Sequence, residues 1–180
     1  MKIVILGGNG YLGWQLYQFL KKKYNCVCIN RVGHRYNYKK LHEKIKDSNI
    51  IIFLAGPNLK KINEKSVFDR LTIIKKIANK IVKSKILIYF STTAKFSRNQ
   101  NKKKYILSHR LAEEYLKQNI NKNNFKIIKL SNVFGLNFLP KENNLKSSPI
   151  NFFINKIIKN ENIKLKTPHA KRNWLPISNF

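Results

Sequence analysis

Residues 1–13 read MKIVILGGNGYLG, and this stretch decides the fold. A run of aliphatic residues, Ile3 to Leu6, leads straight into the spacing Gly7-x-x-Gly10-x-x-Gly13, and an amphipathic segment follows over residues 11–23. A glycine motif between a strand and a helix is typical of a dinucleotide-binding turn. An ordinary turn would need one glycine rather than four. We therefore predict that a pyrophosphate binds at the start of this helix, where N–H groups and the positive end of the helix dipole attract anions.

The rest of the chain alternates between buried-strand patterns and helical patterns. Near-continuous apolar runs predict strands at 2–6, 26–30, 49–55, 85–91 and 125–131, with a short additional strand at Tyr36–Tyr38. Helical patterns lie at 11–23, 39–46, 66–83, 103–121 and 149–160. This alternation predicts an α/β fold, a Rossmann-like doubly wound parallel sheet with the strand order 3-2-1-4-5-6. We expect one domain over residues 1–180.

Bulk properties exclude several classes of protein. No apolar run reaches membrane-spanning length, and the N-terminus has no signal-peptide pattern, so we expect a cytoplasmic protein. The only cysteines, Cys26 and Cys28, stand two apart on a predicted strand, which is too far for an ordinary disulfide. We interpret them as free thiols and predict no metal site, because no further ligands are suitably spaced.

The net charge of +29 raises the alternative of a nucleic-acid-binding protein. The basic residues are mostly lysine and are spread along the whole chain, together with many Asn and Ile, as in proteins from AT-rich genomes. Phosphate recognition usually favours a localised stripe that contains arginine. We therefore predict no specific nucleic-acid partner, and only weak, salt-sensitive binding to polyanions.

Five further segments match, in order along the chain, the motifs of one family: Phe53-Leu-Ala-Gly56, Tyr89-Phe-Ser-Thr-Thr-Ala94, Tyr105-x-x-Ser-His109-x-x-Ala-Glu113, Leu130-Ser-Asn-Val-Phe-Gly135 and Arg172-Asn-Trp-Leu-Pro-Ile177. With the glycine turn, they resemble the extended short-chain dehydrogenases/reductases, the NAD(P)-dependent nucleotide-sugar epimerases, dehydratases and reductases. The resemblance implies cofactor contacts from the glycine turn, the strand end beside the adenosine ribose, the tyrosine helix and the nicotinamide side: Gly7, Asn9, Gly10, Tyr11, Leu12, Gly13, Leu54, Ala55, Gly56, Tyr105, His109 and Asn132.

The same resemblance assigns the catalytic roles. Tyr105 stands where the family has its acid/base, and Thr93 is our choice for the hydroxyl that bonds a substrate oxygen. The family places a lysine four residues after the tyrosine, on the same helix face, where its ammonium favours the ionised phenol and bonds the nicotinamide ribose. This chain has His109 there. A neutral imidazole can still bond ribose, and we expect it to become a cation only at acidic pH.

Arg31 bears on the choice of cofactor. NAD-binding members place an acid at the end of the second strand, whereas an arginine suits the 2′-phosphate of NADP. This chain has Asn30 and Arg31 there and no acid, which favours NADP over NAD.

The family usually continues well beyond the motif that ends at Ile177. Only residues 137–167 could belong to the substrate domain, so we expect a remnant of it and an incomplete pocket, either truncated or completed by a partner. Two readings follow from the resemblance: an enzyme acting on a nucleotide sugar, or a non-catalytic dinucleotide-binding module. We also expect a homodimer.

Overall fold

The computed structural model describes residues 1–30, 37–57, 62–81, 84–94, 99–134, 149–164 and 174–176. It forms two compact units, Met1–Lys129 and Leu130–Phe180. The first is built on a five-stranded sheet with the order β2-β1-β3-β4-β5. These strands are β1 (Lys2–Leu6), β2 (Asn25–Ile29), β3 (Ile50–Phe53), β4 (Ile86–Thr92) and β5 (Phe125–Leu130).

The first strand lies inside the sheet, as a doubly wound fold requires. β1 pairs in parallel with both β2 and β3, with Val4 opposite Val27 on one side and opposite Ile51 on the other. β3 pairs in parallel with β4, with Ile51 opposite Leu87. The predicted parallel α/β fold is therefore confirmed, and the order of these five strands agrees with the predicted one.

The predicted short strand at Tyr36–Tyr38 is wrong over its described part. Asn37 is the N-cap of a helix, and its side chain accepts a hydrogen bond from the Lys40 backbone N–H at 3.0 Å. Tyr38 is the first residue of that helix, and residue 36 lies outside the described part of the chain. The stabilisation of the helix start by the Asn37 cap outweighs the β-propensity of the two tyrosines.

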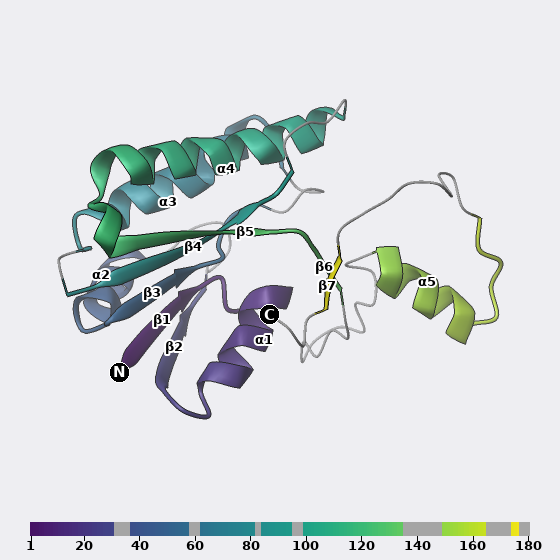
Figure 1. Ribbon diagram of the computed structural model, residues 1–180, viewed down its shortest axis with the longest axis horizontal. Helices are drawn as coiled ribbons and strands as arrows, with labels where there is room; N and C mark the ends of the chain where they lie inside the picture. Colours follow the sequence, from purple (N-terminus) through teal and green to yellow (C-terminus); the bar gives the residue numbers. More distant parts are fainter. Residues whose placement is uncertain are drawn as a thin grey trace. The chain divides into compact units, whose positions relative to one another are not determined.

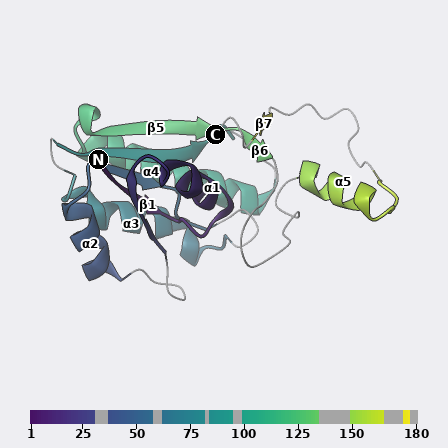
Figure 2. The same ribbon diagram turned by 90° about the horizontal axis from the view of Figure 1, so that it is seen from below.

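Helices cover both faces of the sheet (Figure 1). One face packs against α2 (Tyr38–Lys46), α3 (Asp69–Ala78) and α4 (Gln100–Asn119), and its core includes Leu41, Ile74 and Leu116. The other face packs against α1 (Tyr11–Leu20), which lies in front of the strands in Figure 2. Successive strand residues point to opposite faces, so Val4 joins the first core and Ile5 the second.

The predicted helix over 66–83 is shorter and begins differently. A 3-10 turn, η1 (Lys65–Phe68), runs into α3, which ends at Ala78. The other predicted helices agree with the structure to within three residues at either end.

The second unit contains β6 (Asn132–Phe134), α5 (Pro149–Ile158) and β7 (Trp174–Pro176). β6 and β7 pair in parallel as a two-stranded sheet. In the described part of the chain, no helix combines the length and the apolar character needed to span a bilayer.

Candidate functional site

The glycine turn joins β1 to α1 at the carboxyl edge of the sheet. Gly7 adopts a φ of +92°, which an L side chain rarely tolerates, and its carbonyl accepts a hydrogen bond from the Gly10 N–H at 3.0 Å. A Cβ added at Gly13 would collide with the Gly7 carbonyl, so α1 can approach the turn only because residue 13 has no side chain. The turn and the close helix packing predicted from the spacing are both present.

Gly10 is less tightly enclosed than Gly7 and Gly13. A Cβ added there would meet only the Gly7 carbonyl oxygen, at 3.3 Å. Gly10 is exposed and is the N-cap of α1, so its open side lies at the positive end of the helix dipole. This is the place where a pyrophosphate could approach the backbone.

The turn lies directly against the end of β3, where the adenosine ribose was predicted to bind. A Cβ added at Gly7 would stand 3.0 Å from the Ala55 nitrogen, and the Leu54 N–H donates to the Leu6 carbonyl at 2.9 Å. The structure therefore brings the predicted pyrophosphate turn and the segment from Leu54 to Gly56 together.

Asn30, at the end of β2, holds the turn from the other side. Its side-chain oxygen accepts a hydrogen bond from the Asn9 N–H at 2.9 Å. We predicted no contact between Asn30 and the turn, although its place directly after the second strand was a signal for one. Arg31, the predicted 2′-phosphate contact, lies outside the described residues.

Tyr105 and His109 share one face of α4, as the four-residue spacing predicts. Their ring centroids are 4.7 Å apart in an edge-to-face arrangement, with Tyr105 half-buried and His109 only 4% exposed. The His109 Nδ1 and the Tyr89 hydroxyl of β4 form a 2.8 Å hydrogen bond. The other ring nitrogen, Nε2, forms no hydrogen bond with any of the described residues.

Burial keeps the His109 imidazole neutral. Desolvation first, and then the nearby Arg70 charge, lower its pKa from 6.5 to about 2. Burial likewise raises the pKa of the Tyr89 hydroxyl well above its ordinary value. Because the ring is buried, His109 becomes a cation only at a pH far below the range in which an exposed imidazole is protonated.

Three hydroxyl groups stand at the end of β4, and the structure gives them different surroundings. The buried Ser91 donates a hydrogen bond to the Glu113 carboxylate, and the Thr92 hydroxyl accepts one from the Ala94 N–H at 3.2 Å. Thr93 is exposed. Of the three, Thr93 is the one exposed hydroxyl, and its contact with a substrate oxygen stays a prediction.

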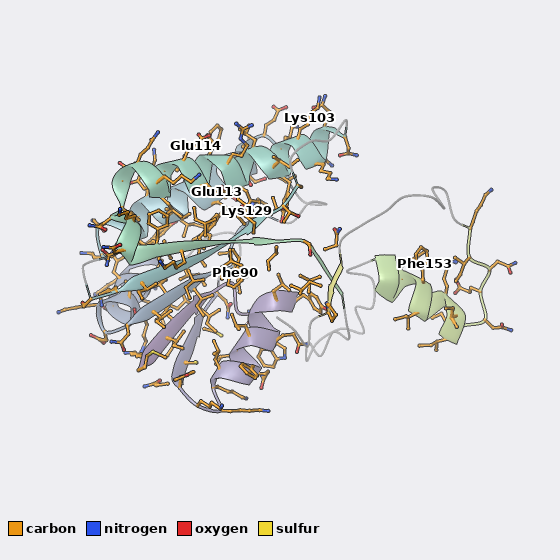
Figure 3. The ribbon with its side chains drawn as sticks, viewed as in Figure 1. Phe90, Lys103, Glu113, Glu114, Lys129 and Phe153 are labelled. Atoms are coloured by element: carbon orange, nitrogen blue, oxygen red, sulfur yellow. The ribbon has the colours of Figure 1, made fainter. Side chains whose placement is uncertain are left out.

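A pocket of about 510 Å³ opens between α4 and the ends of β4 and β5, and Thr93 and His109 both line it. Its wall includes Glu113, which forms an ion pair of 3.5 Å with Lys129 of β5. Figure 3 shows these two side chains lying close together. The pocket combines hydroxyls, carboxylates and cations, which suits a polar ligand.

Arg70, on α3, is a further residue at the site that the sequence analysis missed. It is 5% exposed, and its guanidinium carbon lies 5.1 Å from the centre of the Tyr105 ring. The signal was its place on the apolar stripe of α3, since Arg70, Ile73, Ile74 and Ile77 are the buried residues of that helix.

Asn132, predicted to lie beside the nicotinamide, is the first residue of β6 in the second unit, where it is exposed. Its position as a cofactor contact stays a prediction.

Comparison with known proteins gives a likeness in structure. No protein-family model matches the sequence, and no curated protein matches it either. Among solved structures, a UDP-N-acetylglucosamine 4-epimerase from Methanobrevibacter ruminantium M1, in complex with UDP-N-acetylmuramic acid, superposes with a TM-score of 0.74 at 18% identity, over 98% of this chain and 69% of that one.

Two other solved structures are similar over nearly the whole chain. The capsular polysaccharide assembling protein CapF from Staphylococcus aureus has a TM-score of 0.69 at 20% identity, over 99% of this chain. This chain spans about half of CapF, 47% of its length. Yeast methylglyoxal/isovaleraldehyde reductase Gre2, complexed with NADPH, has a TM-score of 0.70 at 13% identity, over 98% of this chain and 71% of that one.

Identities of this size establish the fold and leave the activity open. The TM-scores of 0.69 to 0.74 over nearly the whole chain show that it shares the fold of these neighbours. The chain has the Rossmann-like doubly wound α/β fold of these solved structures.

Proposed function

We propose that the chain binds a nicotinamide dinucleotide and acts on a nucleotide sugar as an epimerase, dehydratase or reductase, with Tyr105 as acid/base. The observation that carries the proposal is the glycine turn, which packs against Ala55 on one side and leaves Gly10 exposed at the start of α1 on the other. The cofactor, when bound, supplies hydride transfer. The unpartnered Nε2 of the buried His109 also fits, because a ribose hydroxyl could satisfy it.

The chain's own residues supply binding and proton transfer in this proposal. Gly10 and the start of α1 hold the pyrophosphate, and Leu54, Ala55 and Gly56 lie beside the adenosine ribose. Tyr105 exchanges the proton with the substrate, and Thr93 donates a hydrogen bond to the substrate oxygen. We place the protein in the cytoplasm and propose that it forms a homodimer.

We propose NADP rather than NAD as the cofactor. Asn30 is a neutral residue at the position where an acid would repel a 2′-phosphate, and its side-chain oxygen is engaged by Asn9. Arg31 follows it directly and can supply a charge-assisted contact to that phosphate.

A second candidate is a dinucleotide-binding module without catalysis. The observation in its favour is the neutral, buried His109, which cannot supply the permanent charge that a lysine would bring to the tyrosine. Turnover assays with UDP-sugars separate the two candidates. Dinucleotide binding with no turnover of any UDP-sugar would support the non-catalytic binding module.

Calorimetry with NADP and NAD tests the binding proposal, with two glycine variants as a matched pair. In Gly10→Ala the new methyl would meet only the Gly7 carbonyl oxygen, at 3.3 Å, so we expect a modest loss of stability of about 1 kcal/mol, and at least a tenfold loss of dinucleotide affinity because the methyl occupies the ligand side. Gly13→Ala should instead destabilise the fold itself. Absence of binding to the intact wild-type protein would refute the proposal.

A further inference from the structure

Arg70 connects two parts of the first unit that are far apart in the sequence. One guanidinium nitrogen, Nη2, donates a hydrogen bond to the Pro57 carbonyl at 2.8 Å, in the turn after β3. The other, Nη1, donates to the Ser108 hydroxyl of α4 at 2.6 Å. The side chain therefore bridges the turn predicted to meet the adenosine ribose and the helix that carries Tyr105.

The turn after β3 is shaped to admit this side chain. Gly56 adopts a φ of +135°, and a Cβ added there would stand 2.6 Å from the Arg70 Cγ and 2.8 Å from its Cζ. The guanidinium thus occupies the space that any other residue at position 56 would fill.

At its other end the bridge reaches the backbone of Tyr105. The Ser108 hydroxyl, which accepts from Arg70, donates to the Tyr105 carbonyl at 3.0 Å. The guanidinium also lies over the Tyr105 ring, with 5.1 Å between its central carbon and the ring centre. Arg70 therefore contacts the Tyr105 ring directly and is linked to the Tyr105 main chain through Ser108.

We propose that Arg70 is a positioning residue that fastens the turn after β3 to the Tyr105 segment of α4, so that a nucleotide bound at the turn also orders Tyr105. The ordering by a nucleotide rests on the proposed dinucleotide binding, whereas the Arg70 bridge rests on the structure alone. A guanidinium suits this role because its planar fork donates in two directions at once, which a lysine ammonium on a flexible stem does less well.

Hydrogen exchange measured by mass spectrometry tests the inference in segments 52–57 and 101–110. The ligand is adenosine 2′,5′-bisphosphate, the half of NADP that lacks the nicotinamide ribose and so cannot contact His109 directly. In the wild type, saturating amounts of it should slow exchange about tenfold in both segments. In Arg70→Lys, which keeps the charge, it should protect segment 52–57 and leave 101–110 unprotected. Ser108→Ala, which removes only one end of the bridge, should likewise be protected in segment 52–57 and not in 101–110. This variant replaces Arg70→Lys in the test if the latter does not fold.

Lys75→Met is the matched control, since Lys75 is an exposed cation on the same helix that also lies over a tyrosine ring, that of Tyr115 at 5.6 Å. It should behave as the wild type. Equal protection of both segments in Arg70→Lys would overturn the inference. So would unchanged exchange of segment 101–110 when the wild type binds the nucleotide.

Failure of the proposed function would look different. If the wild type binds neither NADP nor NAD, the bridge is still tested without ligand. Arg70→Lys should then speed exchange in both segments together, while Lys75→Met changes neither. Unchanged exchange in the Arg70 variant would overturn the bridge itself.

Discussion

At the scale of single residues, His109 shows how burial changes the chemistry of a familiar position. The ring is held by the Tyr89 hydroxyl and by contact with Tyr105, and its pKa is lowered to about 2. A histidine whose folded pKa lies below its unfolded value of 6.5 stabilises the protein only while it is neutral. Its contribution is therefore complete above pH 6.5 and is lost as the pH falls from 6.5 towards 2.

We expect the wild type to lose about 2 kcal/mol of its free energy of unfolding between pH 7 and pH 5 through this one group. Urea denaturation at the two pH values measures the loss, and in His109→Gln, which cannot be protonated, the difference should be smaller by about that amount. His42→Gln is the control, because it removes an imidazole that is only partly buried. Equal pH dependence in wild type and His109→Gln would show that the imidazole titrates normally in the folded protein.

The network around His109 also marks where prediction from sequence stops. The spacing of four placed Tyr105 and His109 on one helix face, because that depends on the local helix alone. Tyr89 and Arg70 come to this place from β4 and α3, and their contacts with α4 span 20 residues in one case and 38 in the other. Such contacts depend on how helices pack on the sheet, which no local pattern specifies.

At the scale of elements, most strands were predictable because a strand covered on both faces is apolar at nearly every position. Ile50 to Phe53 is an example, with three of its four residues buried. Helix boundaries were less predictable, since capping decides them: Asn37 turned an expected strand into the start of α2. Side-chain capping also stabilises the C-terminal end of α2.

Lys85, just before β4, closes the end of α2. Its ammonium donates hydrogen bonds to the Lys46 carbonyl at 2.6 Å and to the Ser48 carbonyl at 2.7 Å, and the residue is only 9% exposed. Cations at helix C-termini satisfy the last carbonyls and interact favourably with the dipole. Lys85→Met should therefore lower the free energy of unfolding by about 2–3 kcal/mol, because buried carbonyls lose a charged donor.

Urea denaturation checks this value against Lys46→Met. Lys46 is exposed at the end of the same helix, so its substitution should cost no more than about 0.5 kcal/mol. Similar losses in the two variants would mean that Lys85 acts as surface charge and not as a cap.

At the scale of the whole molecule, fold and charge point to different partners. The fold places a glycine turn and a pocket where a dinucleotide and a polar substrate could bind, whereas 37 basic against 8 acidic residues would attract any polyanion. The two kinds of binding differ in their dependence on salt. A polyanion binds largely through counterion release, and a dinucleotide through a formed site with few charges.

We expect affinity for a single-stranded oligonucleotide to fall at least ~100-fold between about 50 and 500 mM salt, as contacts with only about three phosphates would produce. Over the same range, affinity for NADP should fall by less than about tenfold, because hydrogen bonds from the turn and the ribose contacts are weakly screened. Fluorescence polarisation of a labelled oligonucleotide and calorimetry with NADP measure the two curves. An oligonucleotide that stays bound at high salt while NADP is released would reverse the assignment, because specific recognition would then lie with the nucleic acid.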